Sequence, residues 1–196
     1  MRIILASASP RRKELFQKLF PVFEIIPAQS EEAGLAASPE ETVLELAAQK
    51  AEEVSRLLEG TKDYLIAGAD TVVSWQGEIL GKPKHEKDAQ RMLRMLSGNT
   101  HQVYTGVTLM YAKNKRQECI KFAECTDVKF YPVSEAEIKA YIKTGEPMDK
   151  AGSYGIQGLG GRFVERIEGD YENVVGLPVS KIYQVLKKID DFSLPF

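Results

Sequence analysis

The apolar residues of this chain change spacing repeatedly between the period of a strand and that of a helix, which limits the fold to a mixture of both. Helices do not alternate one for one with strands, so the pattern favours an α/β fold with a mixed sheet over a doubly wound one. The expected strands cover 2–6, 22–26, 64–69, 101–111, 117–130 and 162–167, with a hairpin over 72–80 that turns at Gln76-Gly77.

Helix starts are marked by serines that can act as N-caps. Ser9 precedes Pro10, and both Ser38-Pro39-Glu40-Glu41 and Ser134-Glu135-Ala136-Glu137 have the form of a capping box. The expected helices begin at Pro10, run from Ser38 to Gly60, cover 87–96, run from Ser134 to Gly145 and cover 178–189.

Length and charge narrow the class of protein. A chain of 196 residues suggests one domain, or two tightly joined lobes, and we treat 1–196 as a single domain. A formal charge of −2 gives no sign of a nucleic-acid or anionic-membrane surface. No apolar run is long enough for a signal peptide or a membrane span, so we expect a cytoplasmic protein with no membrane partner. Cys119 and Cys125 form no C-x-x-C pair and are expected to be reduced thiols.

Several familiar catalytic motifs are absent. Gly81-Lys82 does not end a phosphate-binding P-loop, because Gln76 and Pro83 occupy positions that need Gly and Ser or Thr. Gly158-x-Gly160 lacks the third glycine of a dinucleotide fingerprint. His85 and His101 have no motif around them and are expected to be incidental surface or strand residues.

Two arginines at the first helix start favour an anion site. Ser7-Ala8-Ser9-Pro10-Arg11-Arg12 lies where a strand passes into a helix, whose N-terminus offers unpaired N–H groups and partial positive charge. Placing Arg11 and Arg12 there opposes the helix dipole by roughly 0.3–1 kcal/mol each, which suggests that they bind an anion. The alternative is that they point into solvent and Ser9 only caps the helix.

Three other segments are ambiguous when each is taken alone. Asp70 follows a buried apolar strand and could be a general base, a metal ligand, or a residue that caps its own turn. Lys82, between Gly and Pro, could be aimed at a ligand or solvated, and Lys50 would by itself be a surface lysine. The glycines of 151–161 could serve close approach to a ligand or a structural turn.

Together these segments supply a carboxylate pair, several cations and a glycine-rich wall. The pair would be Asp70 with Glu31 or Glu32. Phosphoryl chemistry requires neutralisation of charge and positioning more than covalent help, so the set suits hydrolysis of a polyphosphate.

Six blocks resemble the motifs of the Maf family, in the family's order and over nearly the whole chain. They are Ser7-Ala8-Ser9-Pro10-Arg11-Arg12-Lys13-Glu14-Leu15, Gly68-Ala69-Asp70-Thr71-Val72, Gly81-Lys82-Pro83, Met95-Leu96-Ser97-Gly98, the segment 149–158 and Val175-Gly176-Leu177-Pro178. The resemblance implies a two-lobed α/β fold with an elongated mixed sheet and flanking helices, similar to inosine triphosphate pyrophosphatases. It also implies cleavage of a nucleoside triphosphate to the monophosphate and pyrophosphate with a divalent cation, Mg²⁺ or Mn²⁺. Dimers are common in the family, so a homodimer is an expectation.

The resemblance also assigns roles to individual residues. Asp70 matches the catalytic base, and Glu32 the acidic residue that holds the metal with Asp70, although Glu31 beside it leaves the register open. The positions that bind the phosphates are matched by Ser7, Arg12, Lys50 and Lys82.

Three further positions sort the family by substrate. Arg11, Thr71 and Gln157 match the subgroup that acts on dTTP and UTP, and a Gln side chain offers both the donor and the acceptor that the imide edge of the base requires. One alternative is an enzyme for modified purine nucleotides, against which Arg11 argues. Another is a nucleotide-binding regulator of cell division in which hydrolysis is incidental.

Overall fold

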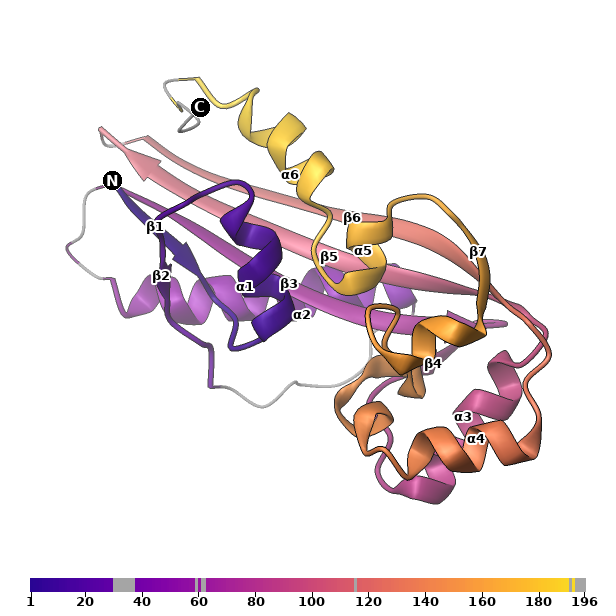
Figure 1. Cartoon of the computed structure of the whole chain (residues 1–196). Coiled ribbons are helices and arrows are strands. Elements are labelled where there is room, and N and C mark those ends of the chain that lie inside the picture. Colours follow the sequence, from indigo (N-terminus) through magenta and orange to yellow (C-terminus); the bar gives the residue numbers. More distant parts are fainter. Residues whose placement is uncertain (30–37, 59, 61–62, 115, 191, 193–196) are drawn as a thin grey trace. The chain divides into compact units, whose positions relative to one another are not determined.

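The structure is a computed structural model that describes residues 1–29, 38–58, 60, 63–114, 116–190 and 192. Within these ranges seven strands form one sheet in the order β2-β1-β3-β5-β6-β7, with β4 paired to β3 (Figure 1). Strand β1 is parallel to β2 and β3, whereas the pairs β3–β4 and β6–β7 are antiparallel. The expected α/β fold with a mixed sheet is therefore confirmed. The strands are β1 Arg2–Leu5, β2 Glu24–Ile25, β3 Tyr64–Trp75, β4 Glu78–Leu80, β5 Thr100–Lys113, β6 Arg116–Phe130 and β7 Val164–Glu168.

The serine caps predicted from the sequence are present at three helices. Ser9, Ser38 and Ser134 each accept a hydrogen bond from the backbone three residues on, and Ser134 with Glu137 completes a capping box. The helices are α1 Pro10–Gln17, α2 Pro39–Arg56, α3 Glu86–Leu96, α4 Glu135–Ile142, α5 Tyr171–Val175 and α6 Val179–Leu186, with 3₁₀ turns at Glu146–Asp149, Ala151–Ser153 and Leu159–Phe163.

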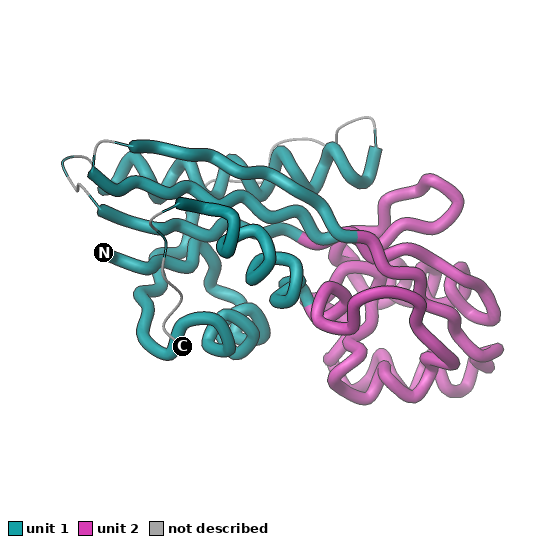
Figure 2. The backbone as a smooth tube through the Cα atoms, turned by 90° about the horizontal axis from the view of Figure 1, so that it is seen from above, with its two compact units in different colours: residues 1–70, 105–124, 176–196 teal, residues 71–104, 125–175 magenta. Residues whose placement is uncertain are grey.

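The chain divides into two compact units. Unit 1 comprises 1–70, 105–124 and 176–196, and unit 2 comprises 71–104 and 125–175 (Figure 2). Strands β3, β5 and β6 each contribute residues to both units. The candidate catalytic and substrate-sorting residues are therefore divided between two separately packed cores.

In unit 1 the sheet lies between helices on both faces. Helix α2 covers one face, and α1 and α6 cover the other (Figures 1 and 2). Helix α2 approaches the strands so closely that two glycines are required: a Cβ on Gly68 would lie 2.9 Å from the Ala51 amide nitrogen, and one on Gly106 would lie 2.8 Å from that of Leu44. This contact fixes the height of α2 above β3 and β5.

Unit 2 has its own core. Helices α3 and α4 pack with the ends of β3, β5 and β6 around buried Leu93, Leu96, Phe130, Ile138 and Tyr154. The pattern of α3, whose buried residues are Ala89, Met92, Leu93 and Leu96, is the helical spacing expected from the sequence.

Both histidines belong to unit 2 and have structural roles. His101 is a fully buried strand residue whose Nε2 lies 2.9 Å from the Tyr154 hydroxyl. Burial lowers the pKa of His101 to about 3, so its ring is neutral at physiological pH. His85 is the N-cap of α3, where its Nδ1 accepts a hydrogen bond from the Asp88 amide at 3.1 Å.

Some boundaries predicted from the sequence were wrong. Strand β3 continues through Asp70 to Trp75 rather than ending near it, because Thr71, Val72 and Val73 favour strand and no turn residue intervenes before Gln76. Strand β2 is only two residues long, and Val22, placed in it by its apolar character, is 86% exposed. Helix α5 was not predicted.

Candidate active site

Asp70 lies in the middle of β3 with its side chain almost fully enclosed. The residue is 6% exposed, and its carboxylate forms an ion pair with Lys50 of α2. An unpaired buried carboxylate would be strongly disfavoured, and Lys50 supplies the opposite charge in this position. The alternative that Asp70 ends a strand and caps its own turn is thereby excluded.

Lys50 reaches Asp70 because α2 lies directly on the strands. Its neighbours Ala47 and Ala51 are fully buried, with the helix backbone seated over Gly68. The Lys50 side chain is only 17% exposed. The lysine is therefore not a surface residue, as its position in the sequence would suggest when taken alone, but one side of a buried charge pair.

The segment between β1 and α1 forms a second group in unit 1. The Ser7 hydroxyl accepts hydrogen bonds from the Ser9 amide at 3.2 Å and from Nη1 of Arg12 at 3.4 Å. Nε of Arg12 donates to the carbonyl of Gly176 at 2.9 Å, so the guanidinium is held in place and does not extend freely into solvent. This arrangement favours the anion-site interpretation of the segment.

Strand pairing relates the two groups. Strand β1 runs parallel to β3, with Leu5 opposite Ala67 and the Ala6 amide bonded to the Ala67 carbonyl at 2.8 Å. Ser7 follows the end of β1, so it lies level with the part of β3 just before Asp70. Because parallel strands present equivalent ends at one edge, unit 1 places the Ser7–Arg12 segment and the Lys50–Asp70 pair in the same region of its sheet.

Lys82 and Gln157 belong to unit 2. Lys82 is exposed, and its turn is tied to the glycine-rich segment by a hydrogen bond from the Gly152 amide to the Gly81 carbonyl, 3.2 Å long. Gly152 has a φ of +66° and a Cβ there would lie 2.8 Å from the Val73 side chain, so glycine is required on both counts. Gln157 is exposed within the same segment.

Two of the residues predicted to sort substrates lie next in the chain to residues predicted to act in catalysis or phosphate binding. Thr71 follows Asp70 directly in β3 and is half-buried. Arg11 precedes Arg12 in the first turn of α1 and is likewise half-buried.

Of the predicted metal ligands, the structure describes only Asp70. Glu31 and Glu32 lie outside the described residues, and within the described ranges no three His, Cys, Asp or Glu side chains converge. The carboxylate of Asp70 suits Mg²⁺ or Mn²⁺, because such an ion takes one or two protein carboxylates and fills its remaining positions with water and phosphate oxygens.

The Gly176 carbonyl was missed as part of the site. Its segment, Val175-Gly176-Leu177-Pro178, matched a family motif but carries no reactive side chain. The structure gives it a role, because a backbone carbonyl there orients the Arg12 guanidinium. The signal in the sequence was the glycine itself, which has a φ of +130°.

Comparisons with known proteins show which family the chain resembles. The family described as Maf-like protein matches residues 2–189. A dTTP/UTP pyrophosphatase of Agathobacter rectalis is 51% identical, over 96% of this chain and 97% of its own. Proteins of the same name from Carboxydothermus hydrogenoformans and Bacillus thuringiensis subsp. konkukian are 51% and 50% identical, over 96% of this chain and 98% and 96% of theirs.

Among solved structures the similarity is weaker. A HAM1 protein from Coxiella burnetii overlaps with 96% of this chain and 100% of its own at a TM-score of 0.49 and 14% identity. The family match and the half-identical relatives cover nearly the whole chain, and the protein therefore belongs to the Maf family.

Proposed function

We propose that this protein is a nucleoside triphosphate pyrophosphatase that hydrolyses dTTP and UTP to the monophosphate and pyrophosphate. The observation that carries the proposal is the buried Asp70–Lys50 pair beside the hydroxyl and guanidinium of the Ser7–Arg12 segment. The proposal is supported by relatives of about half identity that are named dTTP/UTP pyrophosphatase over nearly their full length.

The proposed reaction is an in-line attack of water on the α-phosphorus. Asp70 accepts a proton from the water as its oxygen bonds to phosphorus, and the bond from the α-phosphorus to the bridging oxygen breaks to release pyrophosphate. Lys50, paired with the carboxylate, fixes its direction before the proton is transferred.

Binding of the phosphates is assigned to the cations. Arg12, oriented by Ser7 and the Gly176 carbonyl, can present its remaining N–H donors to phosphate oxygens. Lys82 adds a point charge on a stiff turn, and Lys50 a third cation. A divalent cation, Mg²⁺ or Mn²⁺, held by Asp70 and Glu32, supplies further neutralisation of the phosphate charge when bound.

Choice of base is assigned to Arg11, Thr71 and Gln157. The Gln157 amide has a donor and an acceptor, which complement the imide edge shared by thymine and uracil. Cytosine presents a different pattern of donors and acceptors at the same edge. A comparison of UTP with CTP therefore tests this assignment.

Two properties bear on where the enzyme works. We propose a cytoplasmic location, which is supported by the exposed thiol of Cys119, outside any disulfide. Within the described ranges, every helix is too short or too polar to serve as a membrane span.

The test is release of pyrophosphate and monophosphate from a panel of nucleotides, with Mg²⁺, with Mn²⁺ and with chelator. We expect metal-dependent cleavage of dTTP and UTP, with little action on CTP and purine nucleotides. Asp70→Asn should bind nucleotide but lose turnover by about 10²–10⁴-fold, as expected on removal of a general base. Absence of turnover by the wild-type protein on every nucleotide would refute the proposal.

A further inference from the structure

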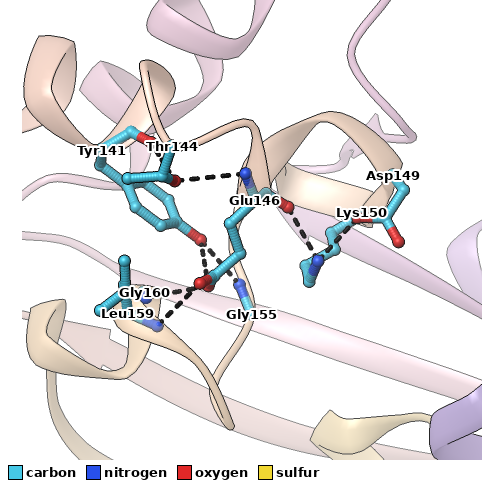
Figure 3. A network of polar contacts seen from close by, with 8 residues as sticks. All are labelled: Tyr141, Thr144, Glu146, Asp149, Lys150, Gly155, Leu159 and Gly160. Atoms are coloured by element: carbon cyan, nitrogen blue, oxygen red, sulfur yellow. Dashed lines mark hydrogen bonds and ion pairs between the residues drawn. The ribbon is translucent and has the colours of Figure 1, made fainter.

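A carboxylate in unit 2 binds the glycine-rich segment at several points. Glu146 follows α4, and its two oxygens accept hydrogen bonds from the Leu159 amide at 2.9 Å, the Gly160 amide at 3.2 Å and the Tyr141 hydroxyl at 2.8 Å (Figure 3). The same Tyr141 hydroxyl accepts from the Gly155 amide at 3.1 Å. Two side chains therefore hold three backbone amides of the segment.

Glu146 is itself fixed through its backbone. Its amide donates to the Thr144 hydroxyl at 3.2 Å, and its carbonyl accepts from Nζ of Lys150 at 2.8 Å (Figure 3). Lys150 also pairs with Asp149 at 2.6 Å. The carboxylate thus extends from an anchored position and is not a mobile surface group.

This carboxylate explains glycines that the sequence left ambiguous. A Cβ on Gly158 would lie 2.6 Å from the carboxyl carbon of Glu146, and one on Gly160 would lie 2.6 Å from the Tyr141 hydroxyl. A Cβ on Gly155 would lie 2.7 Å from the Lys150 side chain. The glycines permit the Tyr141–Glu146 pair to approach the backbone, so they serve that contact whether or not they also approach a ligand.

Gln157 lies between the anchored points. The Gly158 amide bonds to the Gly155 carbonyl at 3.2 Å, which closes a turn with Ile156 and Gln157 at its centre. Gly155 on one side is bound by Tyr141, and Leu159 and Gly160 on the other by Glu146. The direction in which the exposed Gln157 side chain leaves the backbone is therefore set by these two residues.

We propose that Glu146, together with Tyr141, is a positioning residue for substrate selection: it fixes the Gly155–Gly158 turn so that the Gln157 amide is presented to the pyrimidine base. The inference rests on the proposed function, because it requires that Gln157 select the base. It adds a residue that contacts no substrate but determines how well UTP and dTTP are distinguished from CTP.

The charge on Glu146 matters as well as its shape. Burial alone raises the pKa of Glu146, but the hydrogen bonds from Leu159, Gly160 and Tyr141 and the charge of Lys150 outweigh it and hold the pKa below its ordinary value. The group is therefore a carboxylate at neutral pH, able to accept at both oxygens. An amide of the same size has one acceptor and one donor, so it would turn an N–H toward one of the backbone amides.

The first variant is Glu146→Gln, assayed with UTP, dTTP and CTP for kcat and KM separately. We expect KM for UTP and dTTP to rise and the preference for UTP over CTP in kcat/KM to fall by about ten- to a hundredfold, since a displaced positioning group has effects of that size. The kcat at saturating UTP should stay within about threefold of wild type, because Asp70 and Lys50 are unchanged.

Glu135→Gln is the matched control. Glu135 lies at the start of α4, and its exposed carboxylate pairs with Arg94 and Gln90, far along the chain from the turn. The chemical change is the same, but exposed pairs contribute little, so we expect all kinetic constants within about twofold of wild type. Equal loss of selectivity in this variant would overturn the inference.

A double-mutant cycle tests the contact without depending on one variant. Gly158 has a negative φ, and the three atoms nearest to a Cβ there all belong to the Glu146 carboxylate. Gly158→Ala should lower UTP selectivity in the wild-type background and add little in a Glu146→Ala background. Additive effects of the two changes would contradict the proposed contact.

Amide hydrogen exchange separates failure of the inference from failure of the proposed function. The amides of Leu159 and Gly160 should exchange faster in Glu146→Gln than in wild type or Glu135→Gln. The unfolding midpoints of the three proteins are compared to exclude global destabilisation. A wild-type protein inactive on all nucleotides would refute the proposed function and with it the role in base selection. An active wild type with unchanged selectivity and unchanged exchange in Glu146→Gln would refute the inference alone.

Discussion

The region around Asp70 and the region around Gln157 are built in different ways. In unit 1 the candidate catalytic carboxylate, Asp70, lies on a central strand and is paired with a lysine from a long helix, with glycines that bring helix and sheet together. In unit 2 the candidate base-selecting amide lies on a turn that is held by hydrogen bonds from backbone amides to the side chains of Glu146 and Tyr141, and not by strand pairing.

The difference suggests a division of tasks. A group on a strand that is packed on both sides keeps a fixed position, which suits a general base. A turn can change its residues without disturbing the core, which suits substrate choice within a family. Each of the following changes tests whether turnover belongs to the first region and selectivity or local stability to the second.

Of these changes, removal of the Lys50 ammonium should have the largest effect, and that effect is on turnover. Lys50→Met removes the cation paired with the buried Asp70 carboxylate and one of the proposed phosphate-binding charges, so kcat should fall by about 10²-fold. The measurement is kcat for dTTP at saturating substrate. Lys181→Met, which removes an exposed pair with Glu124, is the control and should change little. A normal kcat in Lys50→Met would show that the pair is dispensable.

The second largest effect is expected from a methyl group added at Gly106, which should lower stability. A Cβ there meets the backbone of α2 at Val43 and Leu44, and because backbone cannot turn aside, Gly106→Ala should lower the free energy of unfolding by about 1–3 kcal/mol. It should also lower kcat, because α2 carries Lys50. Gly81→Ala, whose Cβ would meet nothing within 4 Å, is the control for stability in urea unfolding. Equal stability of the two variants would mean that α2 does not lie on the sheet as described.

Acid should weaken unit 2 through His101. The pKa of His101 is lowered by burial to about 3 in the folded protein, so below the unfolded value of about 6.5 the unfolded state binds a proton that the folded state does not. The free energy of unfolding should therefore fall by up to about 1.4 kcal/mol per pH unit between these values. Urea unfolding at pH 7, 6 and 5 should show a steeper loss in wild type than in His101→Gln. Parallel curves would indicate that His101 becomes protonated in the folded state.

The cap at His85 should have the smallest effect. His85→Ala removes the acceptor for the Asp88 amide at the start of α3, at a cost of about 1 kcal/mol in the free energy of unfolding. His85→Asn should restore most of it, because Asn is a favoured cap. The selectivity for UTP should stay unchanged in both variants. An Ala variant as stable as wild type would mean that the cap contributes nothing.

Local signals in the sequence were sufficient for most of the elements. The caps at Ser9, Ser38 and Ser134 and the turn at Gln76-Gly77 were predicted because their chemistry lies within a few residues. The end of β3 was misjudged because Asp70 is a poor strand former in isolation, and only its pairing with Lys50 makes it tolerable inside the sheet.

The site was predictable as a set of residues but not as contacts. Asp70, Arg12 and Lys50 were assigned through the resemblance, whereas their partners depend on chain pairings 20 to 164 residues apart that no local pattern shows. The role of Glu146 was invisible for the same reason: the glycines it requires were evident, but the carboxylate that explains them was not.

The most direct test compares Asp70→Asn with Gln157→Ala on dTTP, UTP and CTP. We predict that Asp70→Asn lowers kcat for every nucleotide by about 10²–10⁴-fold while leaving KM within a few fold. Gln157→Ala should keep kcat for dTTP and UTP but raise their KM and narrow the preference over CTP. Loss of kcat in Gln157→Ala comparable to that in Asp70→Asn, or unchanged selectivity, would contradict the division between a catalytic region in unit 1 and a base-selecting turn in unit 2.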